Sequence, residues 1–162
     1  MRRILPLTIA LAALTVPAAL SADTPGDGTL SVKRGKGSVV LKLKGTVIGR
    51  VKNGRVQVRD FRPLDVNDPV LTGCIPRIRR IGAGISVCKG RNVGFRVVDG
   101  RFNVTVKGSG ISISAVGRGP VTVDGVGDTG VNDGVMSVDD GPYESLPDDP
   151  LTFTLGTSST RR

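Results

Sequence analysis

The residues that most enzymes use for acid–base and nucleophilic chemistry are scarce in this chain of 162 residues. It contains no histidine, which excludes Ser-His and Cys-His pairs, an imidazole base near neutral pH and histidine-containing metal sites. A pair of carboxylates, as in glycoside hydrolysis, remains as an alternative, with acids from Asp124 to Asp149. Most of these acids lie beside Gly or Pro and are typical of turns. The composition therefore predicts a protein that is not an enzyme and uses no cofactor.

Cys74 and Cys88 are the two cysteines of the chain. In an exported protein such a pair predicts one disulfide. Two free thiols or a metal-binding pair are the alternatives, although a metal would need more ligands than these. Closing a loop of this length contributes about 3 kcal/mol in the chain-entropy model. We expect the disulfide to hold the irregular crossing between the two cysteines.

The run from Asp124 to Gly134 interleaves aspartate and asparagine with glycine, as calcium loops do. It resembles the Gly/Asp-rich calcium-binding nonapeptide repeat, but its spacing drifts and no second copy follows. The composition favours structural turns over a calcium loop, so no metal site is predicted.

Basic residues give the chain a formal net charge of +9. We expect a basic sheet face and rim, made of Lys42, Lys44, Arg50, Lys52, Arg55, Arg59, Arg77, Arg79 and Arg80. Such a surface attracts phosphate polymers or an anionic envelope surface through its field and through counterion release. No aromatic residues alternate with these bases, so stacking platforms specific for nucleic acid are missing. A solvated outer face, whose lysines prevent edge-to-edge sheet pairing, is the alternative.

The elements that would carry these residues are short strands. Apolar residues alternate with others from Asn92 to Val123, which predicts four strands in an antiparallel meander. Asp99-Gly100 and Asn53-Gly54 each predict a two-residue hairpin turn. Two further strands are expected at 135–138 and 151–155, with turns between them.

The stretch from Gly37 to Gly45 is similar to the stretch from Gly100 to Gly108. This similarity predicts two related four-stranded halves, unless it reflects only what any two valine-rich meanders share. The fold expected is all-β, an antiparallel β-sandwich or small barrel made of these halves plus a C-terminal hairpin.

The chain begins with Met1-Arg2-Arg3, followed by an apolar run that ends in small residues near Ala22. Residues 1–22 therefore predict a cleaved signal peptide, and the run is shorter than the ~20 apolar residues that a membrane anchor needs. Residues 23–28 are read as a linker, 29–156 as a single β domain and 157–162 as a disordered tail. We expect a secreted or envelope-associated protein with no transmembrane anchor after cleavage.

Two phrases, VKGSGISISAVGRGPVTVDG (Val106 to Gly125) and SVDDGPYESLP (Ser137 to Pro147), together with the signal peptide, resemble small exported all-β proteins of high-GC Gram-positive bacteria. These proteins are uncharacterised, so the resemblance implies location and fold but no function. The sequence thus predicts an exported, non-enzymatic β-domain that is a structural or binding module at the cell envelope. The alternative is a polyanion-binding protein that uses the basic sheet face.

Overall fold

The computed structural model describes residues 26–63, 65, 67–82, 84–126 and 134–156. These residues form one antiparallel sheet of seven strands. The strands are β1 (Gly28–Asp60), β2 (Val70–Thr72), β3 (Arg79–Arg80), β4 (Ile85–Gly125), β5 (Val135–Val138), β6 (Glu144–Ser145) and β7 (Leu151–Leu155). The predicted all-β, antiparallel class is confirmed, and the sheet is not closed into a barrel. None of the described residues belongs to a helix long and apolar enough to cross a membrane.

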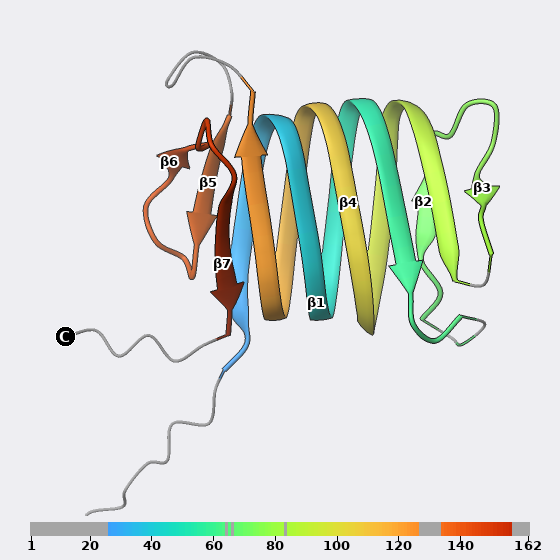
Figure 1. Ribbon diagram of the computed structural model, residues 1–162, viewed down its shortest axis with the longest axis horizontal. Helices are drawn as coiled ribbons and strands as arrows, with labels where there is room; N and C mark the ends of the chain where they lie inside the picture. Colours follow the sequence, from blue (N-terminus) through green and yellow to red (C-terminus); the bar gives the residue numbers. More distant parts are fainter. Residues whose placement is uncertain (1–25, 64, 66, 83, 127–133, 157–162) are drawn as a thin grey trace, which may run out of the picture.

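β1 and β4 are two very long strands that wind together into a coil (Figure 1). Each strand is paired with the other along both of its edges. Val39, for example, pairs with Val106 on one side and with Val123 on the other. These two partners are seventeen residues apart in β4, so one turn of the coil takes about seventeen residues of each strand.

Each turn of the coil has two walls, which meet at corners where the chain passes from one wall to the other. Wall 1 contains residues 38–44 and 55–59 of β1 and residues 85–89, 101–107 and 118–124 of β4, with β3 and β7 at its ends. Wall 2 contains residues 29–33 and 46–52 of β1 and residues 93–97 and 111–116 of β4, with β2 and β5 at its ends.

Glycines stand where the chain passes from one wall to the other. They pair across the strands in two series, Gly125, Gly37, Gly108, Gly54 and Gly90 in one, and Gly28, Gly117, Gly45 and Gly100 in the other. Gly108 has a φ of +150°, and a Cβ placed on it would overlap the carbonyl oxygen of Asn53. Residues with side chains rarely adopt this conformation, and the space is filled by backbone. The corner at Gly108 therefore requires glycine.

The prediction of two hairpins is wrong, because both sites are corners of the coil. At Asn53-Gly54 and at Asp99-Gly100 the chain turns a corner instead of reversing. The segments before and after Asp99-Gly100 do not pair with each other, and both pair with β1: Val97 with Val47, and Phe102 with Leu43. The predicted meander of neighbouring strands is thus replaced by pairing between two distant strands.

The apolar residues that alternate along both long strands point into the coil. The core they form includes Leu41, Val56, Val93, Val104 and Val121, each fully buried or nearly so. The period-2 alternation that predicted a buried face is confirmed, and burying each such side chain stabilises the fold by about 1.5–3 kcal/mol. The core lies between the two walls.

The two similar stretches of the sequence are paired with each other. Gly37 lies opposite Gly108, Gly45 lies opposite Gly100, and Leu41 lies opposite Val104, which is its own counterpart in the similarity. Antiparallel pairing of equivalent segments creates a local two-fold axis between Leu41 and Val104. The similarity therefore relates two interleaved strands of one sheet, not two sheets that stand apart.

The C-terminal strands are at their predicted residues but do not form a hairpin with each other. β5 pairs with β1 and with the short β6, whereas β7 pairs with β4. Together they extend the sheet at one end of the coil, as Figure 1 shows. Between them, Asp139 and Asp140 form the predicted turn, and Asp139 Oδ1 accepts a hydrogen bond of 2.9 Å from the Thr29 amide.

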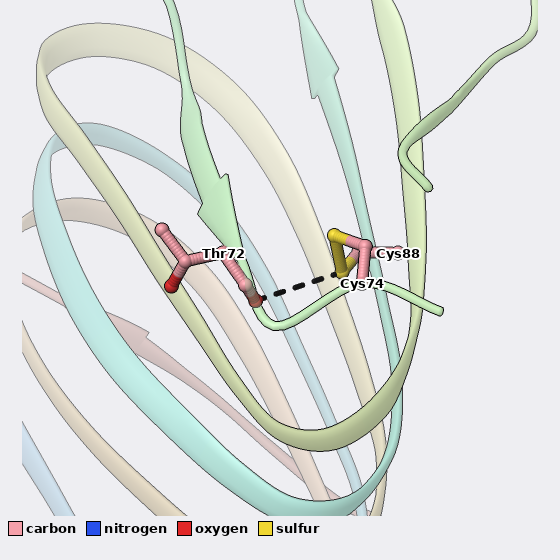
Figure 2. The surroundings of a disulfide bond; sticks show 3 residues. All are labelled: Thr72, Cys74 and Cys88. Carbon is pink, nitrogen blue, oxygen red and sulfur yellow. Dashed lines mark hydrogen bonds between the residues drawn. A yellow bond between two sulfur atoms is a disulfide. The ribbon is translucent and has the colours of Figure 1, made fainter. Parts of the chain in front are cut away.

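The opposite end of the coil carries the disulfide. Cys74 and Cys88 are bonded, with their Cα atoms 5.1 Å apart, so the predicted pairing is confirmed. Cys88 is buried on the inner side of β4, and its sulfur lies 3.8 Å from the carbonyl oxygen of Thr72 (Figure 2). The bond joins the segment after β2 to β4 and closes the loop that contains β3. It indicates an oxidising, extracellular location.

Several predictions lie outside the described residues. They are the signal peptide at residues 1–22, the tail at residues 157–162 and most of the glycine-rich run between Asp124 and Gly134.

Candidate functional site

The nine bases predicted to line a basic face are all exposed, but they are not on one face. Lys42, Lys44, Arg55 and Arg59 lie on wall 1, where they alternate with buried residues of β1. Arg50 and Lys52 follow a glycine corner and lie on wall 2. Arg77, Arg79 and Arg80 are at the disulfide end, where β3 pairs with β4.

β4 adds four exposed bases to wall 1 that the sequence analysis did not include. They are Lys89, Arg101, Lys107 and Arg118. The sequence indicated that two of them face outward, because Arg101 and Lys107 alternate with the buried residues Phe102, Val104 and Val106. Their proximity to the bases of β1 was not visible, because it depends on the pairing of strands that are distant in the sequence.

The pairing places these bases directly opposite one another in two rows. Along one margin of wall 1, Lys44 lies between Arg101 and Arg118; along the other, Arg55 lies between Lys89 and Lys107. Neighbouring strands are about 4.8 Å apart, and like charges directly opposite each other on one face destabilise a sheet. We call these the Lys44 row and the Arg55 row.

Few acids lie among these rows on the wall 1 strands themselves, although Asp60, Asp65 and Asp99 lie near one end of the Lys44 row. Asp124 is the single acid at an outward position of the wall 1 strands. Asp27 Oδ1 accepts a hydrogen bond of 2.8 Å from Arg118 Nε, but both side chains are about half exposed, so the ion pair contributes little stability. Between the rows, Lys42 and Arg59 lie next to the Lys44 row, and the remaining strip, which includes Val40, Thr105 and Thr122, is uncharged. Wall 1 is therefore a positively charged surface with two basic margins.

A cavity of about 740 Å³ adjoins the end of the Lys44 row. Phe61 lines it together with Lys44 and Arg101, and 43% of the Phe61 surface is exposed. The Phe61 amide donates a hydrogen bond of 3.4 Å to the Arg101 carbonyl oxygen, so Phe61 continues the row beyond Arg101. The guanidinium groups of Arg59 and Arg101 lie 5.2 and 5.4 Å from the centre of the Phe61 ring. The cavity thus combines bases with an exposed aromatic ring.

Wall 2 carries a different cluster, centred on Tyr143. The Tyr143 hydroxyl is 3.0 Å from Ser31 Oγ, and Lys33 Nζ is 3.9 Å from the centre of the Tyr143 ring. Hydrogen bonding to Lys33, and then to Ser31, lowers the pKa of Tyr143 below its usual value of 10.0. Tyr143 is 47% exposed and lines a cavity of about 370 Å³ with Ser31 and Ser114.

Three acids at the end of β1 and in the segment after it also lie together. Carboxylate oxygens of Asp60, Asp65 and Asp68 are within 4.8 Å of one another, a spacing that a cation can bridge. Asp65 and Asp68 are exposed, and exposed acids gather in this way without an ion. This cluster was not predicted from the sequence.

No protein-family model matches the chain, and searches of characterised proteins and of solved structures find no significant similarity. Functional inference therefore rests on the coil itself and on the residues that it brings together.

Proposed function

We propose that this chain is an exported, non-enzymatic β-domain that acts as a binding module at the cell envelope, and that wall 1 binds a polyanion. Residues 1–22 would direct export and be removed. The Cys74–Cys88 bond supports this location, because disulfides persist in oxidising surroundings.

The observation that carries the proposal is the arrangement of bases in the Lys44 and Arg55 rows. In each row three bases occupy adjacent strands at directly opposite positions. This arrangement costs stability in the free protein, since the bases repel one another. A bound polyanion removes that repulsion and releases its own counterions, so the same rows favour binding.

The first experiment compares two triple variants that lose the same charge from different walls. One carries Lys42→Gln, Lys44→Gln and Arg59→Gln on wall 1, and the other carries Lys33→Gln, Arg50→Gln and Arg96→Gln on wall 2. Affinity for inorganic polyphosphate is measured over a range of salt concentrations. We expect the wall 1 variant to bind at least about tenfold more weakly, and its slope of log affinity against log salt to fall by about two.

The wall 2 variant is expected to change both quantities much less. Equal losses in the two variants would show that net charge attracts the polymer without a site on wall 1. A wild-type protein that binds no polyanion near physiological salt would contradict the proposed function itself.

A further inference from the structure

The Lys44 row and Phe61 form one continuous line across four neighbouring strand positions. Arg118 and Arg101 flank Lys44, and Phe61 is hydrogen-bonded to Arg101 through the backbone. With strands about 4.8 Å apart, the line from Arg118 to Phe61 spans about 14 Å. Three positive charges therefore lead to an exposed aromatic ring.

The cavity around Phe61 is lined by both basic and acidic residues. Its lining contains the bases Lys44, Arg62 and Arg101, but also the acids Asp60, Asp65 and Asp99. A chain made only of phosphates would meet carboxylates there. A sugar ring fits better, because its hydroxyl groups donate hydrogen bonds to carboxylates and its C–H face packs on an aromatic ring.

We infer that the polyanion bound by wall 1 is an anionic polysaccharide, whose charged groups lie along the Lys44 row and one of whose sugar rings packs against Phe61. The inference depends on the proposed polyanion function and adds the class of polymer. A single-stranded nucleic acid is disfavoured, because it binds through several stacked bases in succession. Among the described residues only Phe61 and Tyr143 have exposed aromatic rings, and Tyr143 lies over wall 2.

The experiment compares three linear polyanions of matched charge: oligogalacturonate, inorganic polyphosphate and oligothymidylate. Each is titrated into the wild-type protein and into Phe61→Leu, Lys44→Gln and Arg96→Gln variants near physiological salt. Phe61→Leu keeps an apolar side chain and removes the ring. Arg96→Gln removes one charge from wall 2 and is the matched control for Lys44→Gln. Thermal melting of each variant checks that the coil is intact.

We expect wild-type protein to bind oligogalacturonate most tightly. Phe61→Leu should weaken that binding by about three- to tenfold and change polyphosphate binding less than about twofold. Lys44→Gln should weaken binding of both polymers, and Arg96→Gln neither.

The other outcomes overturn the inference in distinguishable ways. If Phe61→Leu has no effect and polyphosphate binds as tightly as oligogalacturonate, the inference fails while polyanion binding by wall 1 stands. If oligothymidylate binds most tightly and depends on Phe61, the partner is a nucleic acid. If none of the three polymers binds to the wild-type protein, the proposed function fails and the inference fails with it.

Discussion

At the scale of single residues, neighbouring side chains change the pKa of the Tyr143 phenol. Lys33 and Ser31 stabilise the Tyr143 phenolate, so its pKa is lowered from 10.0. The chain contains no other tyrosine and no tryptophan, so phenolate absorbance reports on Tyr143 alone.

We predict that an ultraviolet titration of the folded protein gives a Tyr143 pKa below 10 and that Lys33→Met raises it toward that value. Lys36→Met, which removes a neighbouring lysine of β1, should leave the titration unchanged. A folded protein whose phenol titrates at its ordinary value would show that Lys33 and Tyr143 do not interact in solution.

The same shift fixes the direction of a pH effect on stability. Between the lowered pKa and pH 10, the unfolded chain binds more protons at Tyr143 than the folded protein does. The contribution of Tyr143 to the free energy of unfolding therefore rises with pH in this interval and is complete above it. At neutral pH the phenol is protonated in both states and contributes nothing through this shift.

At the scale of elements, the glycine corners decide whether β1 and β4 can coil. We predict that Gly108→Ala lowers the free energy of unfolding by about 2 kcal/mol or more, because its Cβ would overlap the Asn53 carbonyl oxygen at a φ of +150°. Gly26→Ala is the control, since no atom lies within 4 Å of the Cβ it would add. Chemical denaturation measures both, and a similar small effect in the two variants would contradict the role of the corner.

The strands could be predicted from the sequence because alternation is a local property. Residues such as Val93, Phe95 and Val104 are buried as their spacing indicates, and the bounds of β5 and β7 agree with the prediction. The partners of the strands could not be predicted, since Asp-Gly and Asn-Gly satisfy both a tight hairpin and a corner. The recurrence of glycine at intervals of alternately about eight and nine residues, as from Gly28 to Gly54, was the available signal for the coil.

At the scale of the whole molecule, the coil brings together bases that the sequence keeps far apart. Of the bases expected on one face, Lys42, Lys44, Arg55 and Arg59 lie on wall 1. The sequence alone could not place Arg118 there, because Arg118 is seventy-four residues from Lys44 in the chain and adjacent to it only in the sheet. Arg50 and Lys52 lie on wall 2 instead, because a glycine corner separates them from Lys44.

Crowding of like charge has a measurable effect on the free protein. We predict that Lys44→Gln raises the free energy of unfolding by about 0.2–1 kcal/mol at low salt, because it removes repulsion from Arg101 and Arg118. Near 1 M salt, where the screening length is about 3 Å, the gain should vanish. Lys42→Gln is the matched control, since Lys42 lies opposite the neutral Asn103.

Denaturant titrations at two salt concentrations distinguish the outcomes. If Lys44→Gln is destabilised at low salt, or has the same stability as Lys42→Gln, the bases of the Lys44 row do not repel one another measurably. A gain in stability together with weaker polymer binding would show that wall 1 is maintained for its ligand at the expense of the fold.

Pairing of β1 with β4 along both edges also restricts how such a chain can change its length. One residue added between two corners would turn every later side chain of that strand to the opposite side and move every later glycine off its partner. A longer or shorter coil would instead require a whole turn of about seventeen residues to be gained or lost in both strands together. Natural variants of this architecture should therefore differ by paired turns, with single-residue insertions confined to the segments beyond the coil.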